Sequence, residues 1–432
     1  MFPTLNYLLN YVFGTTFSLE FPPSFGAMVA LAFLSAAWVL GQELKRKEQL
    51  GLVKPFPVKQ RIGEGPNTLD LALQGLTGFF IGFKLLGFVT EAELFKADPQ
   101  GYILSFQGNW IAGLAVGAVF AWLRYREVKR KQLPTPEDKI VQLRPYEMVG
   151  QITMYAAIFG ILGAKVFHNL EYPAEFFRDP IGSFFSTSGL TFYGGLIGGF
   201  LGVWYIARKR KFALIHLADA VAPGLILAYA VGRMGCFLSG DGDWGIVNSA
   251  YRIDENRKYS LVPAEQFKTD LAATGYYYYF DSETPEGVDH AYFPKPGALS
   301  FLPDWMFAFD FPHNVNRQGI DIQNCPPHMT YCKRLPLPVF PTMLYEILMG
   351  SLLFLGLWLF RNRFKVAGQM FFMYLIMNGL ERLLIEQIRV NAEFRLLGMN
   401  LTQAELIAFA LIGLGTTGVF MAKKWESKLL KW

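Results

Sequence analysis

The sequence predicts an all-α polytopic membrane protein. Of its 432 residues, 52% are hydrophobic and only 17% are charged, and its mean hydropathy is positive. Soluble proteins carry about 25% charged residues, so this composition lies outside their usual range. Long apolar segments also recur along the chain, and basic residues gather in alternate connections between them. These observations exclude an ordinary soluble enzyme.

A helix needs about 20 mostly apolar residues to cross ~30 Å of hydrocarbon. Nine segments of the chain fit this description, and we expect each to be a transmembrane helix. They are residues 23–44, 69–90, 106–123, 147–168, 189–207, 214–238, 338–360, 367–388 and 404–422.

The distribution of lysine and arginine predicts the orientation of these helices, because basic residues in short loops stay on the cytoplasmic side. Basic clusters follow the first, third, fifth, seventh and ninth segments, and the other connections are acidic or nearly neutral. We therefore expect the N-terminus outside and the C-terminus inside. We expect no cleavable signal peptide, because no basic n-region or small-residue cleavage site precedes the first segment.

One connection, residues 239–336, is much longer than the others and is expected on the outer side. Its aromatic runs favour a folded extracytoplasmic head over a linker. The expected domains are therefore a membrane part at 1–238, the head at 239–336 and a second membrane part at 337–432. Disulfides persist in that compartment, so Cys325 and Cys332 are expected to form one, the alternative being two free thiols.

Small residues recur along the predicted helix 189–207, which includes Gly194 and Gly195. Small residues that are four positions apart in a helix let the backbones of two helices approach closely. Simple helix packing would explain this pattern. The alternative is a glycine-lined face beside a ligand.

Charged residues inside the predicted spans are the strongest functional signal. Arg233 lies near the outer end of one span, and Arg382, Glu386 and Arg389 lie in or just after another. An arginine in a membrane helix is costly and is expected to face the bundle interior or a water-filled cavity. A structural Arg382–Glu386 pair and a snorkelling Arg233 would be the simpler explanation. Two guanidinium groups at one depth instead suit a phosphate diester, such as a phospholipid headgroup.

The segment after Arg233 is rich in glycine and includes Asp241 and Asp243. A glycine-rich exit from a helix predicts a tight polar loop at the membrane interface. The Asp-Gly-Asp pattern lacks the further ligands and terminal glutamate of an EF-hand, so no metal site is expected.

Five blocks of this sequence, in order, resemble the prolipoprotein diacylglyceryl transferase family. The family signature Gly-Arg-x-Gly-Asn-Phe-x-Asn-Gly-Glu, followed by Trp-Gly, is similar to residues 232–241, Gly-Arg-Met-Gly-Cys-Phe-Leu-Ser-Gly-Asp, and to Trp244-Gly245. Ser-Phe-His-Gly-Gly-Leu-Ile-Gly is similar to Thr-Phe-Tyr-Gly-Gly-Leu-Ile-Gly at 191–198. The remaining blocks are Gly-Ala-Lys-Val at 163–166, Pro-Thr-Met-Leu-Tyr-Glu at 341–346, and Glu-Arg at 381–382 with the later Glu and Arg at 386 and 389.

The sequence departs from the family pattern at several positions. Tyr193 stands at the family's histidine, Cys236 at the signature asparagine and Lys165 at an arginine. The acidic position is Asp241, with one residue inserted before the tryptophan. Relative to the seven-helix family core, the second and third predicted spans look inserted, and the head is enlarged.

The resemblance implies transfer of the diacylglyceryl group of phosphatidylglycerol to the lipobox cysteine of a prolipoprotein signal peptide, with release of glycerol phosphate. It implies a multi-pass protein of the bacterial inner membrane with its active site toward the outer leaflet. The partners are then phosphatidylglycerol, the signal peptide and the bilayer, with no cofactor and no nucleic acid. The candidate catalytic residues are Arg233, Arg382, Tyr193, Asp241 and Glu386. The candidate substrate-binding residues are Gly194, Gly195, Lys165, Cys236, Ser239, Asp243, Tyr345 and Arg389.

The chemistry fits these residues, because the substrate brings its own thiol nucleophile and the chain shows no catalytic triad. The arginines would stabilise charge on the departing phosphate. Tyr193 is a weak base and is expected to orient or relay, which leaves Asp241, Asp243, Glu386 or the lipid phosphate to accept the proton. Two alternatives remain open at this point: a phospholipid-binding or lipid-translocating protein without thiol chemistry, and a scaffold whose head binds a partner.

Overall fold

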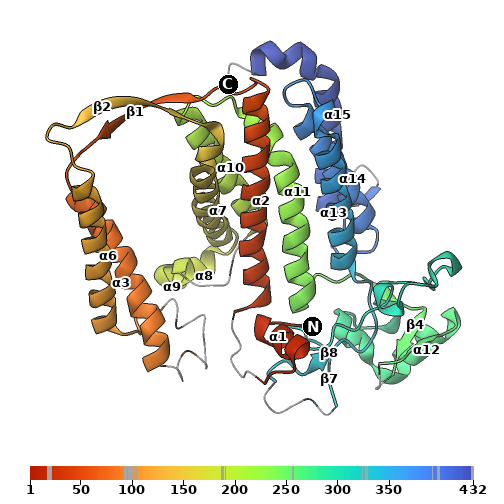
Figure 1. Cartoon of the computed structure of the whole chain (residues 1–432). Coiled ribbons are helices and arrows are strands. Elements are labelled where there is room, and N and C mark those ends of the chain that lie inside the picture. Colours follow the sequence, from red (N-terminus) through yellow and green to blue (C-terminus); the bar gives the residue numbers. More distant parts are fainter. Residues whose placement is uncertain are drawn as a thin grey trace. The chain divides into compact units, whose positions relative to one another are not determined.

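The computed structural model is mostly helical (Figure 1). It describes residues 1–16, 22–91, 95, 102, 105–185, 189, 191–254, 257–323, 325, 329–391, 393–396 and 399–429. The chain divides into two compact units. The first comprises Met1–Ser18, Pro22–Leu52 and Val203–Trp432, and the second comprises Leu19–Phe21 and Val53–Gly202.

Helix α11 (Leu214–Ser239) is the centre of the first unit. It packs against α2 (Ser24–Gln49), α13 (Thr342–Phe360) and α14 (Gln369–Glu386), and α14 packs against α15 (Gln403–Leu429). In Figure 1 α11 runs between α2 and the pair α13 and α14. Over half of the most apolar stretch of α11 is buried, which explains why this helix can carry polar side chains at both ends.

Within the described residues, six helices are long and apolar enough to cross a membrane. They are Ser24–Gln49, Thr68–Phe88, Pro145–Glu171, Leu214–Ser239, Thr342–Arg363 and Gln403–Lys424. A mostly helical protein with several apolar spans is therefore confirmed. The other three predicted spans also fall on helices, at α6, α10 and α14, but the count of nine stays a prediction.

Asp219, at the start of α11, joins three elements at one end of the first unit. Its carboxylate pairs with Lys47 of α2 at 3.3 Å and accepts the backbone N–H groups of Gly368 and Phe371 at 2.8 and 3.0 Å. A carboxylate at a helix N-terminus satisfies unpaired N–H groups and interacts favourably with the helix dipole. Asp219 therefore fixes the start of α14 against α2 and α11.

A second buried carboxylate, Glu43 of α2, lies at this same end of the unit. It is fully buried and contacts Arg46 at 2.7 Å and Arg361 at 3.3 Å. Arg361 in turn lies over the ring of Trp358. Because both arginines pair with it, we interpret Glu43 as a structural residue that joins α2 to the end of α13.

The head, residues 239–336, is folded, with short strands and one helix. Parallel β3 (Val247–Asn248) and β6 (His290–Ala291) pair, as do antiparallel β4 (Tyr251–Ile253) with β5 (Tyr259–Leu261) and β7 (Ile320–Asp321) with β8 (Lys333–Arg334). Helix α12 (Ala264–Thr274) precedes the run of short 3-10 helices. These 3-10 helices are Tyr276–Phe280, Pro285–Gly287, Gly297–Leu299 and Asp304–Met306, and others outside the head are Pro145–Met148 and Arg361–Arg363. Cys325 and Cys332 form a disulfide in the head.

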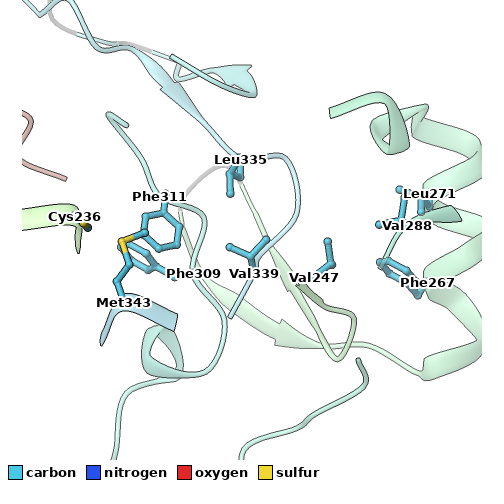
Figure 2. Close-up of a cluster of buried hydrophobic side chains, with 10 residues drawn as sticks. All are labelled: Cys236, Val247, Phe267, Leu271, Val288, Phe309, Phe311, Leu335, Val339 and Met343. Atoms are coloured by element: carbon cyan, nitrogen blue, oxygen red, sulfur yellow. The ribbon is translucent and has the colours of Figure 1, made fainter. Parts of the chain in front are cut away.

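The head is anchored to the bundle through a shared apolar core (Figure 2). Cys236 of α11 and Met343 of α13 lie beside Phe309 and Phe311 at one end of this core. The row then continues through Val247, Leu335 and Val339 to Phe267, Leu271 and Val288 around α12. The core makes the Ser239 end of α11 and the Thr342 end of α13 part of the head's interior.

Backbone hydrogen bonds tie the loop after α11 to both neighbouring helices. Gly245 donates to the carbonyl of Phe340, just before α13, and Ile246 donates to Ile388, just after α14, both at 2.9 Å. A side chain at Gly245 would collide with the Ile388 carbonyl, so only glycine allows this approach. The loop is thereby held against the end of α11, the start of α13 and the end of α14.

The first unit also contains α1 (Leu5–Phe13) and a hairpin of β9 (Glu393–Leu396) and β10 (Met399–Thr402). Neither α1 nor this hairpin is predicted by the pattern of apolar spans. Both are short, and their formation depends on contacts with the rest of the chain.

The second unit begins with a βααβ module, named for its described strands and long helices. Strand β1 (Phe56–Ile62) pairs antiparallel with β2 (Glu137–Leu143), and between them α3 (Thr68–Thr90) packs on α6 (Trp110–Arg130). Glycines on both helices allow close contact, because a side chain at Gly82 would meet the backbone of Ala112. The two strands are not predicted by the sequence pattern, which assigned these residues to loops.

The rest of the second unit comprises α7 (Val149–Glu171), α8 (Pro173–Arg178), α9 (Pro180–Phe185) and the first part of α10 (Phe192–Lys209). Glycines hold α7 and α10 together, since a side chain at Gly163 would meet the backbone of Gly194 and Gly198. Helix packing therefore accounts for the glycine pattern of α10.

Candidate active site

Arg233 lies on α11, two turns before the helix ends at Ser239. Its Nε is 3.1 Å from Glu346 Oε2, and its Nη1 donates to Asp243. Its guanidinium also lies over the ring of Tyr229, one helical turn earlier. The side chain keeps 18% of its surface exposed, so the arginine is paired yet still accessible.

Glu346, on α13, is the common partner of three arginines. Besides Arg233, its Oε1 lies 3.4 Å from Arg389 Nη1 and 4.0 Å from Arg382 Nη1, and it accepts the Tyr229 hydroxyl at 2.9 Å. The Glu346 side chain is fully buried. A buried charge is tolerated only when it is paired, and here the pairing draws α11, α13 and the end of α14 together.

The predicted Arg382–Glu386 pair is present, with Nη2 and Oε2 2.8 Å apart. Glu386 is buried and also accepts from the side chain of Asn391 at 2.8 Å. Arg382 is 25% exposed and Arg389 is 12% exposed. The three arginines thus form a cluster with a partly open surface, with Glu346 and Glu386 buried beneath it.

Asp243, in the loop after α11, bridges two of these arginines. One carboxylate oxygen meets Arg233 and the other lies 2.9 Å from Arg389. Burial by itself raises the pKa of Asp243, but the charges of Arg233 and Arg389 outweigh burial and hold the pKa below its ordinary value. Asp243 is therefore a poor proton acceptor.

Asp241, two residues earlier, has a different environment. Its carboxylate is hydrogen-bonded to the thiol of Cys236, and burial raises its pKa, with the nearby charge of Asp243 acting in the same direction. Ser239 is buried and donates to the carbonyl of Gly235. Asp241 is the more basic of the two loop aspartates.

Cys236, Asp241 and Asp243 place one ligand atom each within 4.8 Å of one another. We assign no metal to this cluster, because Asp243 is already paired with two guanidinium groups whose charge opposes a cation.

Tyr345 is predicted to bind substrate, but its hydroxyl donates to the carbonyl of Met306 in the head at 2.7 Å. This contact connects α13 to the 3-10 helix Asp304–Met306. The described contacts of Tyr345 thus join it to the head, and not to the arginines.

The remaining predicted residues belong to the second unit. Tyr193 is 41% exposed on α10. Gly194 faces α7, where an added side chain would meet the backbone of Gly163, and Gly195 lies over Ala164. Lys165 is buried on α7, and its ammonium group donates to the carbonyl of Ser183 at 3.3 Å. The substrate-binding roles of these residues stay predictions.

Comparison with known proteins decides the family. A profile described as prolipoprotein diacylglyceryl transferase matches residues 105–421, which is most of the chain and includes every residue of the arginine cluster. The chain belongs to the prolipoprotein diacylglyceryl transferase family. The match begins within the βααβ module, and α1 and α2 lie before it.

Curated relatives carry the name phosphatidylglycerol–prolipoprotein diacylglyceryl transferase. The chain is 37% identical to the protein of Dehalococcoides mccartyi over 149 residues, which are 34% of this chain and 53% of that protein. It is 26% identical to the Rhodopirellula baltica protein over 242 residues, 53% of this chain and 46% of that protein. It is 39% identical to the Frankia alni protein over 94 residues, 20% of this chain and 24% of that protein. The chain spans about half, or less, of the length of these relatives.

Three residues of the arginine cluster in this member of the diacylglyceryl transferase family were not predicted from the sequence. Glu346 was noted only as the end of a family block, and Tyr229 and Glu381 were not noted as site residues. The Tyr229 hydroxyl lies 2.9 Å from an oxygen of each of these two carboxylates and shares its one hydrogen between them. The available signal was the cost of a carboxylate within an apolar span, which applies to Glu346 and Glu381 as it does to Arg233.

Proposed function

We propose that this protein transfers the diacylglyceryl group of phosphatidylglycerol to the lipobox cysteine thiol of a prolipoprotein. In this reaction a C–S thioether bond forms as the C–O bond between the diacylglyceryl carbon and the phosphate breaks. The phosphate leaves as glycerol phosphate with the bonding electron pair, and the thiol proton passes to a base. The observation that carries the proposal is the convergence of Arg233, Arg382 and Arg389 on Glu346 in a chain of this family.

The arginine cluster supplies what the leaving phosphate requires. Each guanidinium has five N–H donors, more than its carboxylate partners use, and each keeps part of its surface exposed. Planar guanidinium groups bind phosphate oxygens in a bidentate manner, and donors held rigidly in advance lower the barrier to charge development. Glu346 positions the three groups, so we assign it a positioning role.

Asp241 is our choice for the group that accepts the thiol proton. Asp243 is held by two arginines, and Glu386 is bound by Arg382 and Asn391, so both carboxylates already have charged or polar partners. Asp241 makes no ion pair within the part of the chain that the structure describes, and burial raises its pKa. The thiol of Cys236 lies next to this carboxylate, which indicates that a thiol group fits beside it.

The roles proposed for the second unit follow the family pattern. Tyr193 would orient the phosphate or the thiol, and Gly194, Gly195 and Lys165 would line the substrate site. In the first unit the same pattern assigns substrate-binding roles to Cys236, Ser239 and Tyr345.

We also propose the membrane arrangement in full. The chain would cross the bacterial inner membrane nine times, with its N-terminus and the 239–336 head outside and its C-terminus in the cytoplasm. The 1–238 and 337–432 membrane parts would flank the head. The arginine cluster, which lies at the head's end of α11, would then face the outer leaflet.

The test uses the purified full chain in nanodiscs that contain phosphatidylglycerol, incubated with a lipobox peptide. Mass spectrometry should detect a diacylglyceryl thioether on the cysteine, and a peptide with serine in its place should stay unmodified. Arg233→Ala should abolish the product. Arg361→Ala removes an arginine from the opposite end of α13 and serves as the matched control that should remain active.

If the wild-type protein binds phosphatidylglycerol but never modifies the peptide, the transferase proposal fails. The protein would then be a phospholipid-binding member of the family.

A further inference from the structure

Helix α1 has an unusual distribution of exposed side chains. Four residues in its second half are exposed, namely Leu9 at 42%, Tyr11 at 79%, Val12 at 59% and Phe13 at 71%. All four are apolar or aromatic, and α1 contains no charged residue. At about 100° per residue, Leu9, Val12 and Phe13 occupy one sector of the helix. A soluble protein would turn this sector inward.

The opposite side of α1 is the side that contacts protein. The Tyr7 hydroxyl accepts the backbone N–H of Thr330 at 3.2 Å, and its ring packs edge-on against Tyr331 in the head. Asn10 accepts a hydrogen bond from the hydroxyl of Thr15 at 2.8 Å. Tyr7 therefore joins the helix to the head, whereas Leu9, Val12 and Phe13 face outward. Tyr11, on the same side as Tyr7, is also exposed, and its ring packs against Phe2.

Backbone hydrogen bonds place α1 level with the ends of two apolar spans. Leu5, its first residue, donates to Pro22, and Ser24, the first residue of α2, donates to Pro3, both at 2.9 Å. Phe2 donates to Leu238 at 2.6 Å, one residue before α11 ends. Since α2 and α11 both qualify as membrane spans, α1 begins where these spans end.

We propose that α1 is an interfacial helix, and that Leu9, Val12 and Phe13 insert into the lipid leaflet at the head's end of α2 and α11. The ligand is the bilayer itself, at the boundary between headgroups and acyl chains. Helices with one apolar face, rich in leucine and aromatic residues, adopt this position. Phe25, 45% exposed at the start of α2, would contact the same leaflet when that span is inserted.

The proposal does not depend on the transferase activity. It adds a lipid contact before the region matched by the family profile, which begins at residue 105. Through Phe2 and Leu238 this contact would fix the end of α11, the helix that carries Arg233, at a set depth.

The experiment measures the depth of a fluorophore attached at position 12. The full chain with Val12→Cys is labelled with an environment-sensitive probe and reconstituted in vesicles of phosphatidylcholine and phosphatidylglycerol. Native cysteines should not react, because Cys236 is buried and Cys325 is bonded to Cys332, and the wild-type chain provides the labelling blank. Nitroxide lipids then quench the probe either near the headgroup or near the end of the acyl chain.

Two matched variants calibrate the quenching. Leu34→Cys, 68% exposed on α2, should be quenched most by the deep nitroxide. Thr269→Cys, exposed on α12 of the head, should be quenched by neither. We expect the Val12→Cys probe to be quenched several-fold more by the shallow nitroxide than by the deep one.

A probe at position 12 that behaves like the one at Thr269 would overturn the proposal, because the face would then contact water. So would a probe that is shielded from water but quenched by neither nitroxide, since a second copy or another protein would then cover the face.

Discussion

The substitution Glu346→Gln removes one negative charge from the centre of the arginine cluster and keeps the shape of the side chain. The amide oxygen can still accept the Tyr229 hydroxyl, which lies 2.9 Å from Glu346 in the structure. What is lost is the charge that faces Arg233 at 3.1 Å, Arg389 at 3.4 Å and Arg382 at 4.0 Å. The amide nitrogen would also point its hydrogens at one of these cations.

The expected loss follows from these contacts. A hydrogen bond to a charged group contributes about 1.5–3 kcal/mol. Asp243 and Glu386 remain as partners, so we expect the loss of about one such interaction in the positioning of the guanidinium groups. If that interaction acts in the transition state, kcat/KM falls by about 10- to 150-fold.

The control is Glu43→Gln, because Glu43 is equally buried and also pairs with two arginines, but at the other end of the bundle. Both variants should lower the thermal stability measured in detergent, since each leaves buried arginines with one partner fewer. Only Glu346→Gln should lower kcat/KM in the lipobox-peptide assay. Equal loss of activity in both variants, or turnover within threefold of wild type for folded Glu346→Gln, would refute the positioning role.

Four further outcomes are expected. Arg233→Lys should lose activity by at least 10-fold although its charge is kept, because an ammonium cannot reproduce the bidentate guanidinium, and near-normal turnover would remove Arg233 from the site. Tyr193→Phe should be slower by about 10- to 150-fold and Tyr193→His should be active, whereas an unimpaired Phe variant would mean that the ring only packs. A base works when deprotonated, so kcat/KM should rise with pH through the pKa of Asp241, which burial sets above its ordinary 3.8, and Asp241→Asn should abolish that rise along with most of the activity. An impermeant maleimide should label Cys325 and Cys332 from the outside only after reduction, and labelling only from the cytoplasmic side would contradict the proposed orientation.

Charged groups in apolar spans are costly, so Arg233, Arg382 and Glu386 could be expected from the sequence to have partners or ligands. The structure gives each of them a charged partner, including the Arg382–Glu386 pair at 2.8 Å that the sequence offered as the simpler explanation for these residues. Their catalytic roles stay predictions. The role of Glu346 as common partner was not predictable, because it depends on how three helices meet.

The two loop aspartates show that a position matched to a family signature need not be the residue that makes the contacts. The pattern places the acidic residue of the signature at Asp241, yet Asp243 is the one that bridges Arg233 and Arg389. Gly240 and Gly242 both adopt positive φ, at 63° and 97°, so the backbone turns sharply around Asp241 and directs the next carboxylate to the arginines.

Short elements escaped prediction for a different reason. Helix α1 has nine residues and the β1–β2 ribbon has seven residues in each strand, and neither length is stable in isolation. Contacts with the head stabilise α1, and the packed helices α3 and α6 lie between the two strands of the ribbon in the chain. The formation of these short elements thus depends on tertiary contacts, which local periodicity does not reveal.

The pairing of Arg233 with Glu346 has a consequence for how the protein is made. Chains are synthesised from the N-terminus, so α11 and its arginine leave the ribosome more than a hundred residues before Glu346 does. During that interval we expect α11 to enter the bilayer with Arg233 lacking this partner, and an arginine costs roughly 2.5–3.5 kcal/mol at the centre of a span and less near its end, where Arg233 lies. Asp243 follows in the next loop and can pair with Arg233 early, but Glu346 becomes available only when α13 arrives, after the head has been synthesised. We therefore expect assembly of the bundle to be completed late, when α13 and α14 pack against α11 and Glu346 pairs with Arg233.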